Sequence, residues 1–271
     1  MLPLRDENPH PPGFKPKVTY ALIIINVIVF LLQVIYTGQF FDFSMVDYNQ
    51  AGEIIKIYPD TIDMYYNWGA VPSCITGANE LNINFGAGPV TISCPNVSFI
   101  SLLSSTFMHG GLMHLGGNLL FLWIFGDNIE QKFGKVKYLG IYLLWGILAG
   151  LMHIMGDPTS PIPAVGASGA ISGVLGAYLV IFPKARIQTF LMLGFFWRMM
   201  HIQARWFLPF WLVFQNLLPF FIGGFGIAGG GVAYLAHIGG FAVGLATGYL
   251  YKKTHSSDFT YGTRYGYRPD Y

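Results

Sequence analysis

Residues 166–173 read Gly-Ala-Ser-Gly-Ala-Ile-Ser-Gly and open an apolar run that is long enough for a helix. The hydroxyl of Ser168, framed by small residues, is a candidate nucleophile. A purely structural interpretation also fits, because Gly, Ala and Ser are common where membrane helices approach closely. A second stretch, Ala236-His-Ile-Gly-Gly240, places the imidazole of His237 inside another apolar run. An ionisable group there indicates function, and a serine nucleophile needs such a base.

Composition shows which class of protein carries this pair. Of the 271 residues, 53% are hydrophobic and 10% are charged, against about 25% charged residues in an ordinary soluble domain. The sequence therefore predicts an integral membrane protein. A net charge of +2 is too small to indicate a nucleic-acid partner, and no basic stretch is long enough to follow a phosphate backbone.

The N-terminal part of the chain predicts a short soluble segment followed by a membrane span. Residues 1–17 contain several prolines and are expected to form a cytoplasmic segment without a long helix. Residues 18–36 are an apolar run that covers about 28 Å as a helix, enough to span a bilayer core. A signal peptide is the alternative, but no small-x-small cleavage site follows. We therefore expect a retained first span.

Residues 37–105 differ in character, because they are rich in acidic residues and turn formers. We expect them to form a folded loop on the exoplasmic side of the membrane. Both cysteines of the chain, Cys74 and Cys94, lie in this loop. Their confinement to one aqueous loop predicts a disulfide in an oxidising compartment, with two reduced thiols as the alternative.

The rest of the chain predicts five further spans, which makes six in a membrane domain of residues 18–251. The further apolar runs lie near residues 107–126, with an interruption, and near 136–155, 166–182, 205–222 and 231–251. Residues 187–201 have too short an apolar part to cross, and we expect an interfacial or re-entrant hairpin there. With the N-terminus inside, fourteen of the fifteen Lys and Arg residues are cytoplasmic. This predicts a cell-membrane protein with both termini in the cytoplasm, the tail being residues 252–271.

The predicted topology places Ser168 and His237 at similar depth, near the outer ends of their spans. Both spans also carry small residues at intervals of four, which permit close backbone contact. These residues are Gly169, Gly173 and Ala177 in one span and Gly240, Gly244 and Gly248 in the other.

The run near residues 107–126 supplies further polar side chains. His114 and Asn118 are four residues apart and therefore share one helix face. Acyl transfer generates an oxyanion, and the His114 ring, the Asn118 amide and the Ser168 backbone N–H are candidate donors to it. Alternatively, His109, His114 and Asn118 only hold helices together, or the histidine pair binds a metal. No carboxylate or thiolate lies at ligand spacing, so we expect neither a metal nor another cofactor.

In these motifs the chain resembles the rhomboid family of intramembrane serine proteases. The agreement in order and spacing extends from about residue 97 to 251 and includes His109-x4-His114-x3-Asn118, Gly166-x-Ser168-Gly169 and Ala236-His237-x2-Gly240-x3-Gly244. The resemblance implies an all-α polytopic membrane protein, a bundle of six transmembrane helices with a large exoplasmic loop between the first two. It further implies that Ser168 is the nucleophile, that His237 is the general base, and that the three donors above stabilise the oxyanion. Structural roles near the site fall to His109, Gly166, Gly169, Gly240 and Gly244.

The implied activity is cleavage of a peptide bond in or beside a transmembrane helix, by a Ser-His dyad without a third acidic member. The expected partners are single-span or other transmembrane substrates and membrane lipid, with no nucleic acid. The alternatives are a catalytically inactive relative that binds or escorts membrane proteins, and a transporter, although no internal repeat supports a transporter.

Two departures from the family pattern concern how the site is held. The family commonly has a Trp-Arg pair in its outer loop where this chain has Ile100-Ser101. Some members also have a Tyr four residues after the nucleophile, where this chain has Ser172. We therefore expect other packing to position His237, or a direct hydrogen bond from Ser172.

Overall fold

The computed structural model describes residues 1–49, 54–84, 89–95, 98–193, 196–222 and 233–255. The predicted start of the last span at residue 231 and most of the predicted tail, residues 256–271, lie outside this part of the chain. The described chain is mostly helical, and each of the six predicted apolar runs contains a helix.

Five continuous helices and one composite helix account for these runs. The continuous helices are α1 (Lys17–Thr37), α5 (Leu112–Phe133), α6 (Lys135–Gly156), α7 (Ser168–Ile181) and α10 (Tyr234–Thr254). The composite helix consists of α8 (Ala204–Leu212), the π-helical turn η3 (Val213–Leu217) and α9 (Leu218–Ile222). Among the described residues, α1 and α6 are long and apolar enough to cross a membrane by length and composition, and α7 is a shorter apolar helix.

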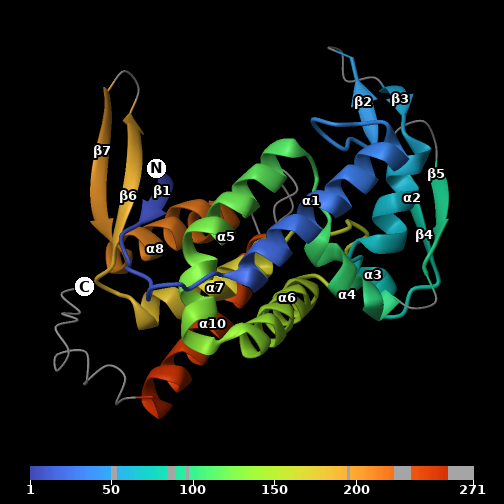
Figure 1. Cartoon of the computed structure of the whole chain (residues 1–271). Helices are drawn as coiled ribbons and strands as arrows, with labels where there is room; N and C mark the ends of the chain where they lie inside the picture. The colour runs from blue at the N-terminus through green and yellow to red at the C-terminus, as the bar shows by residue number, and fades with distance from the viewer. Residues whose placement is uncertain (50–53, 85–88, 96–97, 194–195, 223–232, 256–271) are drawn as a thin grey trace.

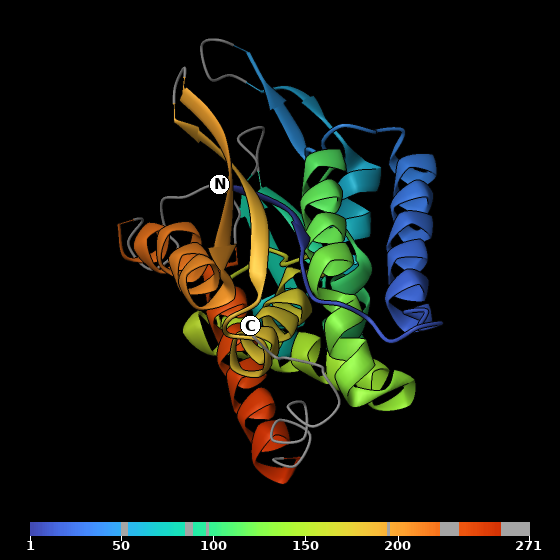
Figure 2. The same cartoon turned by 60° about the vertical axis from the view of Figure 1, so that its left-hand side comes forward.

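Helix α7 occupies the middle of the molecule, in contact with α5, α6 and α10 (Figures 1 and 2). Most of its residues are buried. Its small residues face those of α10, as the sequence predicted: a Cβ at Gly240 would overlap the carbonyl of Gly169, and one at Gly248 would lie 3.0 Å from Ala177 Cα. Glycine therefore permits the backbone contact that fixes these two helices together.

Helix α1 presents an apolar face to the surroundings and a polar contact at its first turn. Ile28, Leu32 and Ile35 are 51%, 59% and 79% exposed, as expected of a helix that borders hydrocarbon. At its N-terminus the buried carboxylate of Glu130 accepts the backbone N–H of Val18 at 3.0 Å and that of Thr19 at 2.8 Å. A negative charge is favourable at this end of a helix, so Glu130 of α5 fixes the start of α1.

The segment between α1 and α5 folds around a hydrophobic cluster that includes Phe43, Tyr65 and Leu81 and that Phe30 of α1 joins. Cys74 and Cys94 are linked by a disulfide within this segment. Figure 1 shows the segment at one end of the helices. Its elements are β2 (Val46–Tyr48), β3 (Ile54–Ile57), α2 (Pro59–Trp68), α3 (Pro72–Ile75), β4 (Glu80–Asn84), β5 (Pro89–Ser93), η1 (Ser98–Ile100), α4 (Ser101–Ser104) and η2 (Ser105–Phe107).

A three-stranded sheet lies at the other end of the helices (Figure 1). The predicted hairpin at residues 187–201 is a β-hairpin of β6 (Arg186–Leu193) and β7 (Phe196–Gln203), and β1 (Leu2–Asp6) pairs antiparallel with β6. In β6 the side chains of Ile187 and Thr189 are buried whereas their neighbours are not, the alternation of a strand. The expectation of an all-α chain is therefore wrong here and in the hairpins β2–β3 and β4–β5, because segments outside the helices satisfy their backbone groups by pairing.

Candidate active site

Ser168 is held at the start of α7 by the backbone before it. Gly166 has a φ of +132°, which side-chain-bearing residues rarely adopt, and its N–H donates to the Ser105 carbonyl at 2.8 Å. As the first residue of α7, Ser168 has a backbone N–H without a partner inside the helix. Ser168 therefore offers both a candidate nucleophile and a backbone donor that the helix itself does not use.

The structure brings Ser168 and His237 together across 69 residues of sequence. Ser168 Oγ lies 2.6 Å from His237 Nε2, and His237 belongs to the first turn of α10. The indole of Trp211 lies beside the imidazole, with ring centroids 6.4 Å apart. The two candidate catalytic side chains are thus within hydrogen-bond distance.

His114 of α5 borders the same site, and Asn118 lies one helical turn further along α5. His114 Nδ1 accepts the N–H of Gly110 at 3.2 Å, so in the neutral ring Nε2 carries the proton. A Cβ at Gly166 would lie 2.8 Å from His114 Nε2 and 3.5 Å from Ser168 Oγ. The absent side chain of Gly166 therefore leaves a small space that both atoms border. Asn118 is buried, and its Nδ2 has no hydrogen-bond partner among the described residues.

His109 is held through its backbone. Gln33 of α1 donates from Nε2 to the His109 carbonyl and accepts the His109 N–H at Oε1, each at 3.0 Å. The buried His109 ring packs edge-on against His114, with centroids 5.2 Å apart. Gln33 of α1 therefore anchors the backbone just before α5.

The large segment between α1 and α5 also hydrogen-bonds to the backbone just before Ser168, between α6 and α7. Ala70 and Ala164 exchange both backbone hydrogen bonds, at 3.0 and 2.9 Å, and Ser73 N–H donates to the Ser160 carbonyl at 3.1 Å. The position of Ser168 therefore depends on this segment as well as on the helices.

The Ser172 hydroxyl does not hydrogen-bond to His237. Its Oγ donates to the Ser168 carbonyl at 2.7 Å, one helical turn back. This is the usual bond of a serine inside a helix. The alternative that Ser172 hydrogen-bonds to His237 is therefore wrong.

Sequence reasoning missed Asn216, which lies at the other ring nitrogen of His237. The Asn216 Oδ1 atom is 2.6 Å from His237 Nδ1, and Asn216 is 1% exposed. The available signal was a single asparagine inside the predicted fifth span, and polar residues in such spans indicate functional sites.

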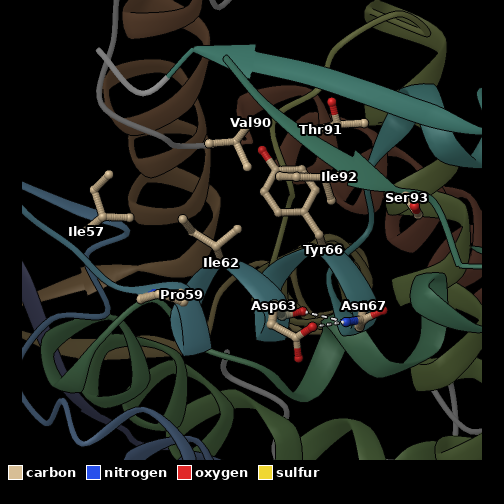
Figure 3. Close-up of a pocket in the computed structure, with 10 residues that line it drawn as sticks. All are labelled: Ile57, Pro59, Ile62, Asp63, Tyr66, Asn67, Val90, Thr91, Ile92 and Ser93. Carbon is tan, nitrogen blue, oxygen red and sulfur yellow. Dashed lines mark hydrogen bonds between the residues drawn. The ribbon is translucent and has the colours of Figure 1, made fainter. Parts of the chain in front are cut away.

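The described chain has two hollows that bear on where chemistry could take place. A groove of about 510 Å³ lies between α2 and β5, where Ile62 and Tyr66 project towards Val90 and Asp63 accepts from Asn67 at 2.7 Å (Figure 3). No histidine or lysine is among its ten lining residues. A cavity of about 40 Å³ adjoins Ser168 and is lined in part by Ser105, Thr106 and His153. The nucleophile and base candidates occur together at Ser168, which is therefore the better candidate.

Comparisons with known proteins identify a family model and several relatives that this chain matches. Residues 96–254 match the family model of the Rhomboid domain. Rhomboid protein 1, mitochondrial, of Saccharomyces cerevisiae is 29% identical over 164 residues, which cover 58% of this chain and 43% of that protein. Rhomboid protease GluP of Bacillus subtilis is 41% identical over 80 residues, 30% of this chain and 15% of that protein. The human presenilin-associated rhomboid-like protein, mitochondrial, is 33% identical over 88 residues, 32% of this chain and 23% of that protein.

These relatives correct one prediction and establish the family. The chain spans less than half the length of each. The predicted cell-membrane location is wrong by this comparison, because the yeast and human relatives are named as mitochondrial proteins and point to a mitochondrial membrane. The family match implies a helical, polytopic membrane fold, and the described chain is mostly helical. Since the Rhomboid domain covers more than half of the sequence, the chain belongs to the rhomboid family.

Proposed function

We propose that this protein is an intramembrane serine protease that cleaves transmembrane segments of other membrane proteins. The observation that carries the proposal is the 2.6 Å distance between Ser168 Oγ and His237 Nε2. A serine hydroxyl becomes a nucleophile when an adjacent base takes its proton, and this distance suits that transfer. The relative named as a protease, GluP, supports the assignment.

In the proposed mechanism, Ser168 Oγ attacks the carbonyl carbon of the scissile bond while His237 Nε2 takes the hydroxyl proton. The resulting oxyanion occupies the space beside Gly166. His114 Nε2–H, Asn118 Nδ2–H and the Ser168 N–H are its donors, and such donors contribute strongly to catalysis. His237 then gives its proton to the leaving amine, which breaks the peptide bond and leaves an acyl-enzyme. Water, activated by His237, hydrolyses the ester and restores Ser168.

The proposed substrates are single-span or other transmembrane proteins. A peptide bond inside a helix has its carbonyl engaged in the helical hydrogen bonds, so the substrate must unwind before attack. We further propose six spans, formed by α1, α5, α6, α7, the composite helix α8–α9, and α10. In this arrangement Ser168 and His237 lie towards the side that carries the segment of residues 37–105, and residues 1–17 and the tail after residue 251 lie on the opposite side.

The test is cleavage of tagged single-span substrates by the purified protein in proteoliposomes. The wild type is expected to cut substrates within or beside their spans, and Ser168→Ala is expected to cut none, because no acyl-enzyme can form. Ser172→Ala is the matched control, since that buried serine lies one turn away and bonds only within the helix. A folded wild type that binds the substrates without cleaving any, as an inactive escort protein would, contradicts the proposal.

A further inference from the structure

The composite helix α8–α9 places one polar side chain against the catalytic histidine candidate. In η3, Val213, Phe214 and Gln215 are exposed and Leu217 is half-buried, whereas Asn216 is 1% exposed. Its Oδ1 atom lies 2.6 Å from His237 Nδ1. Burying an amide without a partner is unfavourable, so this contact accounts for the presence of Asn216 at this depth.

The local backbone explains why Asn216 points inward. Pro209 lies inside α8, and the following turn has π-helical hydrogen bonding. A π-helical turn has more residues per turn than an α-helix, so its side chains, including that of Asn216, take other directions around the helix axis, and such turns are frequent at functional sites. The second contact of the amide is weak, because its Nδ2 lies 3.5 Å from the Trp211 carbonyl oxygen. The bond to His237 is therefore its main interaction.

The chemistry of the two groups fixes the direction of this hydrogen bond. An amide oxygen only accepts, so His237 Nδ1 carries the hydrogen and donates it to Asn216 Oδ1. In the neutral ring, Nε2 then has a free lone pair, and this lone pair faces Ser168 Oγ at 2.6 Å. This is the tautomer that a general base needs, and an imidazole held by an asparagine also occurs in Cys-His-Asn proteases.

We propose that Asn216 is a positioning residue, which holds His237 in the tautomer and ring orientation that accept the Ser168 proton. The inference rests on the proposed function and adds a neutral third member to the dyad. When Nε2 takes the proton, the amide oxygen also stabilises the imidazolium as the negative end of a dipole. The ionisable side chains that act electrostatically on His237 are His114 of α5 and His153 of α6.

Removal of the acceptor tests the inference first. Asn216→Leu is expected to lower kcat about 10- to 100-fold with little change in KM, a smaller loss than for a carboxylate partner of a catalytic histidine because the amide is neutral. Gln215→Leu is the matched control, because it removes an exposed amide from the same turn, and it should keep wild-type kcat. Equal kcat for Asn216→Leu and the wild type would overturn the inference.

The pH profile separates positioning from packing. Asn216→Asp keeps the size and the acceptor but adds a negative charge that favours protonated His237. The acidic limb of kcat/KM should therefore move to higher pH by about one unit or more, with activity above Asn216→Leu at alkaline pH. An unmoved limb in an active Asn216→Asp protein overturns the inference, even if Asn216→Leu does not fold. Residual cleavage by Ser168→Ala would instead overturn the proposed function, so the two failures are distinguishable.

Discussion

At the scale of single residues, Asn118 of α5 carries a buried donor without a partner among the described residues. The Nδ2 atom of Asn118 is buried without a hydrogen bond among the described residues, and such a group costs about 1–3 kcal/mol. A cost of this size is understandable if the donor is used during the reaction. The proposed oxyanion would be the partner that is missing in the resting protein.

Replacement of Asn118 should therefore affect catalysis more than folding. We expect Asn118→Ala to lower kcat about 10²- to 10³-fold, the usual loss for one oxyanion donor. Initial rates and thermal unfolding in the same detergent check this. A variant with wild-type kcat and a much lower Tm would show that Asn118 only joins helices.

Asp6 gives a prediction about pH and stability. Its burial raises the pKa of this carboxyl to about 6 from an ordinary value of 3.8, against the opposing hydrogen bond from Tyr178. Because the pKa is higher in the folded state, the folded protein binds the proton more tightly. Protonated Asp6 therefore favours the folded state over the unfolded state. This contribution to the free energy of unfolding is complete below the unfolded pKa and is lost as the pH rises through about 6.

The measurement is thermal unfolding of the wild type and of Asp6→Asn from about pH 4 to pH 7. The wild type should lose stability relative to Asp6→Asn across this range, because the variant stays neutral. His10 and Asp127, which act on Asp6 electrostatically, are kept in both proteins. A difference in Tm between the two proteins that stays constant across this pH range would show that the ionisation of Asp6 does not cause the loss of stability.

Single residues were predictable where they stand in a spaced pattern. Ser168 and His237 were found because each lies among small residues in an apolar run, and the structure places them 2.6 Å apart. Asn216 was not found, because its position depends on a π-helical turn that no spacing in the sequence shows. The sequence also did not predict the hydrogen bond from the Ser172 hydroxyl to the Ser168 carbonyl, because a serine inside a helix can bond either to a neighbouring helix or to its own backbone one turn back.

At the scale of elements, the contact between α7 and α10 supports the site, because these helices carry Ser168 and His237. A Cβ at Gly244 would overlap the carbonyl of Gly173 and lie 2.7 Å from its Cα. Neither atom can move without moving the helix. The separation of the two helices therefore depends on the absence of this side chain.

Gly244→Ala should lower both stability and activity. Forcing extra volume into a packed contact costs about 1–3 kcal/mol, and a displaced α10 would move His237 away from Ser168. Gly140→Ala in α6 is the matched control, because nothing lies within 4 Å of a Cβ there. Tm and cleavage rate are measured for both variants. Equal values for Gly244→Ala and Gly140→Ala would show that the close contact at Gly244 does not set the position of α10.

Helices were easier to predict than strands. Apolar length identified the helical runs, but α5 continues to Phe133, past the apolar run that ended near residue 126. Its polar end makes specific contacts there, such as Glu130 with Thr19 of α1. Strand β1 was missed because its partner β6 lies about 180 residues later, and pairing at such separation leaves no local pattern.

At the scale of the whole molecule, the two ends of the helices are closed by different structures. The segment between α1 and α5 covers one end and pairs with the backbone that leads to Ser168, and the sheet of β1, β6 and β7 lies at the other end (Figure 1). Water needed for hydrolysis should reach Ser168 from the first end, where this segment lies.

Thiol labelling in oriented proteoliposomes tests the direction of access. A cysteine in Ser168→Cys should react with a membrane-impermeant maleimide added on the side that carries residues 37–105. Ser172→Cys should not react, because that position is 1% exposed. Reaction of Ser168→Cys from the opposite side alone would show that the proposed topology is inverted.

The most direct test of the central proposal is the mass of a covalent adduct. A fluorophosphonate reacts with a serine whose proton is taken by a neighbouring base, as the contact between Ser168 and His237 provides. After incubation of the wild type and digestion, mass spectrometry should locate one phosphonylated residue, Ser168, and the adduct should be absent from His237→Ala. An adduct on another serine, or equal labelling of Ser168 in His237→Ala, would contradict the account.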